Sequence, residues 1–418
     1  MSRKRAFLVM YMLISVMFAW GQGDWTVLGL PRSGRYDDVY FINDTVGWTA
    51  SGDRRIHHTR DGGKTWDLQF IAPGYLRSIE FATPQLGFCG SLDSALYRTT
   101  DGGTTWTDIT NTISQRPKGI CGLAAPDAQN IYGCGIWHGP AFIIKSTNGG
   151  ASWSYIDMSA YASRLVDIFF LNKDTGFVTG TAAPASDGGV ILYTTNGGLN
   201  WQVKFKTMFT DDIVWKIQTP DSLHFFASIQ SLPGRPARII RSVDKGLNWN
   251  SITIMQNYEN LEMVGFVNKN LGWTGGRQAL FKTTDGGLTW SNNLVSEGRG
   301  YNRFFRVNSQ TVYLSGYVLY KLKASALPPP GAPTDHTLQV IPNPVKGSGR
   351  IQLGLATNTF ASLSIYTSEG KKVKDLLHGY TAEGFHNIPL NMNAYARGTY
   401  YVVLRSNEGI MHATVIKN

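Results

Sequence analysis

Two pairs of adjacent carboxylates, Asp37-Asp38 and Asp211-Asp212, have the residue types and spacing best suited to acid–base chemistry in this sequence. Glycoside hydrolysis uses two carboxyl groups about 5–9.5 Å apart, one as an acid and one as a base or nucleophile. An aspartate can equally cap a turn, because its side chain bonds the backbone N–H groups that follow it. The fold around the two pairs decides between these roles.

One polar turn occurs six times, as HTRDGGKTW, RTTDGGTTW, KSTNGGASW, YTTNGGLNW, RSVDKGLNW and KTTDGGLTW. The intervals between its tryptophans are 40, 47, 48, 48 and 41 residues. A catalytic site needs different residues that converge on one point, whereas a turn that recurs at this period indicates stacked structural units. The acidic or amide residues and the tryptophans of these repeated turns are Asp61, Trp66, Asp101, Trp106, Asn148, Trp153, Asn196, Trp201, Asp244, Trp249, Asp285 and Trp290.

A second pattern alternates with the repeated turns. It consists of an apolar run, a turn rich in Asn, Asp or Pro, and another apolar run, and it occurs seven times from 38–52 to 303–317. Each copy predicts a hairpin, and each repeated turn adds a second hairpin. Two hairpins form a four-stranded blade, so the sequence predicts an all-β chain with a seven-bladed β-propeller. Residues 25–30 lack a preceding turn, and we expect them to complete the seventh blade from the other end of the chain.

The repeated turns resemble the Asp-box, or BNR repeat, and the single ring resembles the photosystem II stability/assembly factor family over residues 24–324. The resemblance implies a structural role for these turns at the outer rim. We expect the Asp or Asn side chain to bond its own turn, the glycines to adopt positive φ, and the Trp to pack between blades. Lys245 replaces the usual glycine, which predicts a distorted fifth turn.

The ends of the propeller differ from it in composition. A basic start, an apolar run of 15 residues and small residues at 19 and 21 predict a signal peptide over 1–21, and the propeller then covers 22–324. We expect no membrane span in the mature protein. The formal charge of +10 includes three basic residues of the signal segment and is too small to indicate nucleic-acid binding.

No spacing of Cys and His suggests a metal, and no motif suggests a cofactor. Cys121 and Cys134 flank the inner hairpin of blade three, where they form either a disulfide or two small buried residues. Cys89 has no evident mate.

Residues 325–337 are rich in proline and predict an extended linker. Residues 338–418 then read as strands of a small Ig-like β-sandwich. Three stretches of this segment, PNP at 342–344, IYTSEGKKV and YARGTYYVVLRSNEG, resemble the C-terminal sorting domain of the type IX secretion system. The departures are Tyr395, where the family usually has Leu, and a final Ile-Lys-Asn. The resemblance implies a partner in the type IX machinery, transit through the periplasm, and delivery to the surface or medium of a Gram-negative bacterium of Bacteroidetes type.

A glycoside hydrolase is the alternative function. A sialidase-like enzyme opens with an Arg-Ile-Pro motif, but the corresponding stretch here reads GLPRSGRYDD. A xyloglucanase-like enzyme forms its cleft between two propellers, and this chain has one. The two aspartate pairs precede the inner strands of blades one and five, on opposite sides of a seven-membered ring. We therefore expect a protein without catalytic residues.

Segments that lead into the inner strands should surround one mouth of the central funnel. They are rich in Arg, which offers forked donors, and in Tyr and Trp, which offer flat contact surfaces. We expect these residues to bind a peptide segment, a protein or a glycan of anionic character. The candidate ligand-binding residues are Arg35, Tyr36, Tyr75, Arg77, Arg116, Lys118, Trp137, Tyr161, Arg164, Tyr258, Arg299, Tyr301 and Arg303.

Overall fold

The computed structural model describes residues 24–31, 34–135, 140–293, 299–327, 335–356, 359–381, 384–406 and 409–418. The expected signal peptide and Trp137 lie outside these ranges. Within them, no helix has the length and hydrophobicity that crossing a bilayer requires.

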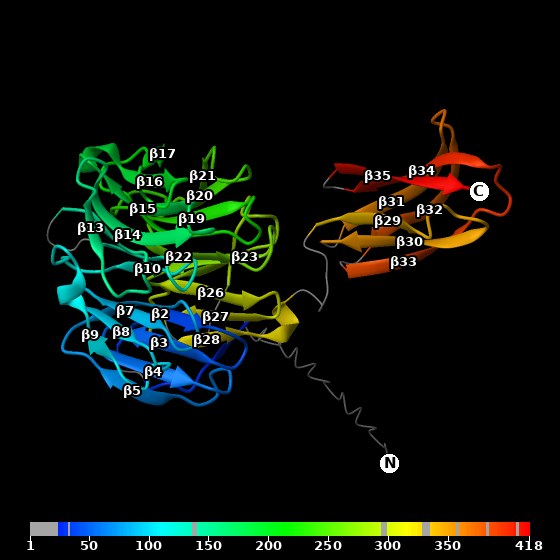
Figure 1. Cartoon of the computed structure of the whole chain (residues 1–418). Helices are drawn as coiled ribbons and strands as arrows, with labels where there is room; N and C mark the ends of the chain where they lie inside the picture. Colours follow the sequence, from blue (N-terminus) through cyan, green and yellow to red (C-terminus); the bar gives the residue numbers. More distant parts are fainter. Residues whose placement is uncertain are drawn as a thin grey trace, which may run out of the picture.

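Seven four-stranded antiparallel sheets follow one another around a ring, which confirms the predicted propeller (Figure 1). Six of the sheets use four consecutive strands, and in each the first strand is innermost. Their bounds are β2 (Tyr36–Phe41), β3 (Gly47–Ser51), β4 (Arg55–Thr59), β5 (Asp67–Ile71); β6 (Leu76–Phe81), β7 (Gly87–Ser91), β8 (Leu96–Thr99), β9 (Thr107–Asp108); β10 (Gly122–Ala124), β11 (Ile131–Gly135), β12 (Phe142–Ser146), β13 (Ser154–Asp157); β14 (Ala162–Phe170), β15 (Gly176–Ala182), β16 (Gly189–Thr194), β17 (Gln202–Lys206); β18 (Ile213–Gln218), β19 (Phe225–Gln230), β20 (Ala237–Ser242), β21 (Asn250–Met255); and β22 (Leu261–Phe266), β23 (Gly272–Gly276), β24 (Leu280–Thr283), β25 (Ser291–Asn292).

The seventh blade joins both ends of the propeller. Its strand order is β1-β28-β27-β26, from β1 (Trp25–Val27) at the rim to β26 (Arg303–Asn308) at the axis. The strands β27 (Thr311–Ser315) and β28 (Leu319–Leu322) lie between them. Trp25 pairs with Leu322 and Val27 with Tyr320. The predicted closure by the N-terminal strand is therefore confirmed.

The repeated turns have the predicted structure. In the first, Asp61 accepts a hydrogen bond from the backbone N–H of Thr65 at 2.9 Å, and both glycines have positive φ. The backbone and side-chain donors of Thr65 lower the pKa of Asp61 to about 2. The expectation for Lys245 is wrong: it adopts a φ of 63°, and the next N–H still reaches the Ser242 hydroxyl at 3.0 Å. The turn accepts a side chain at this position because an exposed residue can adopt the left-handed conformation at modest cost.

The apolar core lies between neighbouring blades. Phe41 of blade one stacks on Tyr313 of blade seven with centroids 3.7 Å apart, and Trp66 meets Phe41 edge-on. Trp66 also packs in the cluster that contains Tyr313 of blade seven, and Trp153 of blade three contacts Phe88 of blade two. The tryptophans thus join adjacent blades, as expected. All three cysteines are buried and none takes part in a disulfide, so Cys121 and Cys134 are the two small buried residues of the alternative.

The C-terminal segment forms two packed antiparallel sheets with their own core. One sheet contains β29 (Thr337–Ile341), β30 (Ser348–Leu355) and β33 (Gly384–Asn391); the other contains β32 (Lys372–Thr381), β31 (Thr359–Thr367), β34 (Gly398–Ser406) and β35 (Gly409–Lys417). This agrees with the predicted sandwich. Three short 3-10 helices complete the described structure: η1 (Thr110–Thr112), η2 (Ala185–Asp187) and η3 (Ala324–Ala326).

Candidate functional site

One position of the repeat brings side chains from all seven blades to the propeller axis. In most blades the pairing of the first two strands slips by one residue at this position, as a β-bulge does. A bulge turns the extra side chain away from the core between the sheets. We call the seven equivalent residues the axial ring: Asp37, Arg77, Cys121, Val166, Trp215, Glu262 and Asn302.

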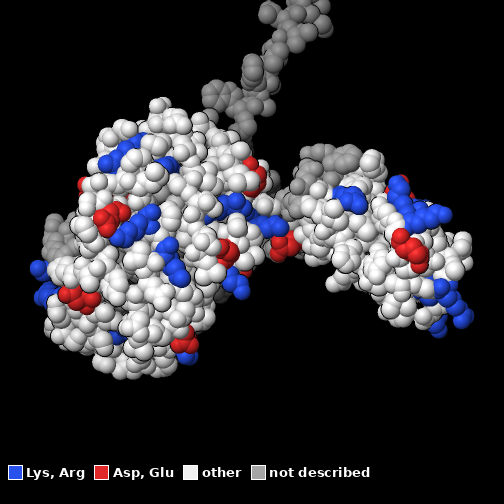
Figure 2. Space-filling model, turned by 90° about the horizontal axis from the view of Figure 1, so that it is seen from above, with Lys and Arg blue, Asp and Glu red and all other residues white. Residues whose placement is uncertain are grey.

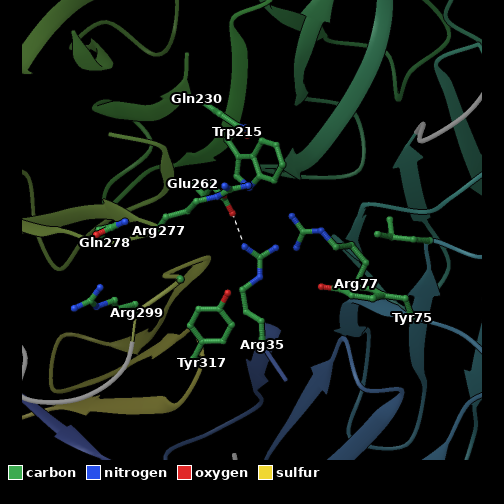
Figure 3. A pocket seen from close by; sticks show the side chains of 12 residues that line it. Arg35, Tyr75, Arg77, Trp215, Gln230, Glu262, Arg277, Gln278, Arg299 and Tyr317 are labelled. Atoms are coloured by element: carbon green, nitrogen blue, oxygen red, sulfur yellow. Dashed lines mark hydrogen bonds and ion pairs between the residues drawn. The ribbon is translucent and has the colours of Figure 1, made fainter. Parts of the chain in front are cut away.

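A cavity of about 770 Å³ opens above part of this ring (Figure 3). Residues from the ring, from the segments before the inner strands and from loops within blades form its wall. The lining residues are Arg35, Tyr75, Arg77, Leu92, Trp215, Gln230, Glu262, Arg277, Gln278, Arg299, Gly300 and Tyr317. We call this cavity the arginine pocket, because four of its residues are arginines.

A buried carboxylate, Asp37, holds one side of the arginine pocket together. Its Oδ1 lies 2.6 Å from Nε of Arg35 and 3.0 Å from Nδ2 of Asn302. The Tyr75 hydroxyl donates to Oδ2, and Arg77 Nη1 lies 3.6 Å from Oδ1. Burial and the Asp37 carboxylate together raise the pKa of Tyr75 to about 12. Asp37 therefore fixes three of the side chains that form the wall.

The remaining charges leave the arginine pocket cationic. Arg35 also donates to Glu262 through Nη1 at 2.6 Å, so both carboxylates neutralise the same guanidinium (Figure 3). Arg277 is 70% exposed and lies 4.0 Å from Glu262. Arg299 is exposed, and within the described ranges its guanidinium has no hydrogen-bond or ion-pair partner. Positive charge thus remains on the open side of the pocket.

The opposite wall is apolar. Trp215 packs with Cys121, Val166 and Leu92, and the Arg77 guanidinium lies 5.6 Å from the centre of the Trp215 ring. Two buried polar atoms of this region, Nη1 of Arg77 and Oε1 of Gln230, make no hydrogen bond to any described residue. Nη1 of Arg77 instead faces the Asp37 carboxylate at 3.6 Å, so its charge is partly balanced from behind the wall.

A layer of charged residues closes the channel beneath the axial ring. Arg303 lies 3.4 Å from both Asp38 and Asp167, and Lys216 donates to Asp167 at 3.0 Å. Asp38 and Asp167 each also accept a backbone N–H from a neighbouring inner strand, at 3.1 Å. These residues have mutual partners and separate the arginine pocket from a second cavity of about 190 Å³ that Arg303 and Lys216 also line.

The structure brings four of the predicted ligand-binding residues together: Arg35, Tyr75, Arg77 and Arg299 all line the arginine pocket. Three other predictions are wrong about position. Tyr36 and Tyr301 point into the cores between blades, and Arg303 belongs to the charged layer. Their side chains alternate with the axial ring along the inner strands, so they cannot face the mouth.

Five further predicted residues are described but do not line the arginine pocket. Arg116 and Lys118 are exposed, and Tyr258 bonds Asn260. Tyr161 and Arg164 lie at the start of blade four, where Val166 is the residue that faces the axis. The predicted ligand-binding residues that do not line the arginine pocket are thus Arg116, Lys118, Tyr161, Arg164 and Tyr258. Trp137 lies outside the described residues.

Trp215, Glu262, Gln230 and Tyr317 were missed from the sequence. The first two occupy the same position of the repeat as Asp37 and Arg77, and that equivalence is the signal that could have identified them. Their orientation toward the axis depends on a bulge, which the sequence does not reveal.

The second aspartate pair lies outside the arginine pocket. Asp212 is buried and accepts from Ser231 and Arg238, each at 2.7 Å. Asp211 has a positive φ at the preceding turn. Among the described residues no three His, Cys, Asp or Glu side chains form a possible metal site. Figure 2 shows basic and acidic side chains interspersed over one face of the propeller, without a broad surface of one sign.

Comparison with solved structures shows the same propeller fold in other proteins. YCF48 from Cyanidioschyzon merolae is 18% identical, with a TM-score of 0.57 over 72% of this chain and 99% of that one. A structure of YCF48 bound to D1 peptide matches equally well, covering 96% of that chain. The GH74 enzyme of Niastella koreensis is 14% identical, with a TM-score of 0.53 over 94% of this chain and 67% of that one.

No curated protein matches the sequence significantly. Residues 339–418, however, match the family model of the secretion system C-terminal sorting domain. Proteins with this domain are exported by type IX secretion to the cell surface or the medium of Bacteroidetes. The chain is therefore an exported seven-bladed β-propeller with the fold of YCF48, and it ends in a secretion system C-terminal sorting domain.

Proposed function

We propose that the propeller is a non-catalytic binding module that holds an acidic peptide segment in the arginine pocket. The observation that carries the proposal is the excess of arginine over acid around one cavity. Four arginines line it against a single glutamate, with Asp37 buried behind them. Carboxylates are natural partners of guanidinium groups, because two N–H donors match their two oxygens.

The shape of the arginine pocket also suits a peptide. A cavity of about 770 Å³ is within the range of ligand sites and can hold a few residues of an extended chain. Trp215 and Leu92 offer apolar contact, and Gln230 adds a polar side chain to the wall. A propeller of the same fold has been solved with a bound peptide, which supports the choice of ligand class.

The geometry gives a hydrolase little support. One axial-ring carboxylate, Asp37, is fully buried and accepts hydrogen bonds from three side chains. Glu262 is bound to the same Arg35 guanidinium. A glycosidase needs two carboxyl groups that face the scissile bond, and here both are occupied by protein donors. We therefore favour binding without turnover.

The test is binding of fluorescein-labelled octapeptides to the full exported chain, measured by anisotropy. One set carries Asp or Glu beside one apolar residue, and the matched set carries Asn or Gln. We expect the acidic set to bind, and at least tenfold more weakly in Arg277→Ala/Arg299→Ala, because two exposed cations are lost. Raising salt from 0.05 M to 0.5 M should also weaken binding, since the screening length falls below about 10 Å.

The matched control is Arg116→Ala/Arg164→Ala, which removes the same charge from residues outside the arginine pocket. Its affinity should stay within about twofold of the original protein at 0.15 M salt, since charges beyond about 8 Å are screened. Equal losses in both double variants would show nonspecific attraction. Binding of oligosaccharides instead of peptides, or release of a shortened product, would refute the proposal.

A further inference from the structure

One residue of the axial ring, Asn302, connects three parts of the wall of the arginine pocket. It lies in blade seven directly before β26 and has no exposed surface. Its bonding partners come from blades one, two and five. A single buried carboxamide thus contacts side chains from both sides of the axis.

Both ends of the Asn302 carboxamide form hydrogen bonds. Nδ2 donates to the Asp37 carbonyl oxygen at 2.7 Å and to Asp37 Oδ1 at 3.0 Å. Oδ1 accepts from the indole N–H of Trp215 at 3.1 Å and from Nη2 of Arg77 at 3.4 Å. A carboxamide has two N–H donors and one oxygen with two acceptor sites, so no capacity is left over.

These contacts decide how two pocket residues are oriented. With Nη2 of Arg77 directed at Asn302, Nη1 faces the Asp37 carboxylate at 3.6 Å. The same Asn302 oxygen fixes the edge of Trp215, whose ring lies against the Arg77 guanidinium. No other axial-ring side chain bonds both residues among the described contacts.

We propose that Asn302 is a positioning residue, which determines binding in the arginine pocket by orienting Arg77 and Trp215 without contacting the ligand itself. This inference rests on the proposed function only where it is tested by peptide affinity. Asp or Leu cannot replace Asn here, because Asp would place a second carboxylate against Asp37 and Leu would supply no bonds.

The test combines two independent readouts on Asn302→Ala in the full exported chain. The first is the ¹⁹F spectrum of protein labelled with 5-fluorotryptophan, with the Trp215 signal assigned by Trp215→Phe. We expect that signal to shift and broaden while the Trp25 signal stays in place. The second is affinity for the tightest acidic octapeptide, which should fall at least tenfold.

A double variant separates positioning from a loss of stability. Asn302→Ala should weaken binding less in the Arg77→Ala background than in the original protein, because part of its effect acts through the Arg77 guanidinium that is already gone. The control is Thr181→Val, which loses a fully buried hydrogen bond to Asp212 at 2.9 Å outside the pocket. It should leave both the affinity and the Trp215 signal unchanged.

An unshifted Trp215 signal, or original affinity in Asn302→Ala, would overturn the inference. If Asn302→Ala melts too low for measurement, Asn302→Gln replaces it, since the longer side chain displaces the carboxamide without removing it, and affinity should again fall. If no octapeptide binds the original protein, the proposed function fails while the Trp215 signal still tests the positioning role.

Discussion

At the scale of single residues, the channel holds a carboxyl group whose environment favours its neutral form. Burial raises the pKa of Glu80 to about 8. The positive charge of Arg303 opposes this shift, and the negative charge of Asp38 adds to it. The unfolded chain releases this proton near pH 4.5, while the folded protein retains it up to about pH 8. The folded state therefore binds more protons between these values, and its stability falls as pH rises across that window.

Glu80→Gln keeps the shape of the side chain and cannot ionise, so it should remove this dependence. We expect the variant to be more stable than the original protein at pH 8.5 by about 4 kcal/mol, and nearly equal to it at pH 4.5. Urea unfolding of both proteins at several pH values measures the difference. A difference that stays constant from pH 4.5 to 8.5 would show that Glu80 does not titrate in this way.

At the scale of elements, ring closure depends on a strand of three residues, β1. Trp25 packs edge-on against Trp273 with centroids 5.4 Å apart and also meets Phe304. Trp25→Ala should lower the free energy of unfolding by about 3–5 kcal/mol, because it empties a buried site between blades six and seven. Thr26→Ala on the same strand is the control. Because Thr26 is exposed, this substitution should change the free energy of unfolding by less than about 0.5 kcal/mol.

Deleting residues 22–30 extends the same test to the whole strand. It removes the partner of β28 and leaves an unpaired edge, so we expect a lower melting temperature and concentration-dependent association. Thermal unfolding and light scattering measure both effects. A truncated protein with the original melting temperature would mean that closure does not depend on β1.

The elements also show what the sequence could predict. Repeated turns and hairpins specify blade number, strand order and closure, because each unit carries its own turn chemistry and apolar pattern. The arginine pocket was predicted only in part. Arg35, Tyr75 and Arg299 precede inner strands, and a strand boundary is visible in sequence. The orientation of Trp215 depends on a bulge, and the role of Asn302 depends on contacts across the axis with residues far apart in the chain.

At the scale of the whole molecule, the propeller and the sandwich have separate cores. The apolar cluster of the sandwich runs from Val345 to Val415 and includes no propeller residue. Among the described contacts, an ion pair between Lys269 and Asp335 at 2.8 Å joins the propeller to the following segment, and the Asp335 side chain in it is 59% exposed. An exposed pair of this kind contributes at most about 1 kcal/mol. Folding of the propeller should therefore not require the sandwich.

Export of the protein should require the C-terminal sandwich, because this sorting domain is the part that type IX secretion recognises. Deleting residues 338–418 should leave a propeller with an unchanged melting temperature that accumulates in the periplasm. Cell fractionation and thermal unfolding of the recovered protein measure location and folding separately. The control is full-length Arg277→Ala/Arg299→Ala, which alters the arginine pocket and should still reach the surface or medium. A truncated propeller outside the cell would contradict the export route, whereas a lower melting temperature would contradict the independence of the two cores.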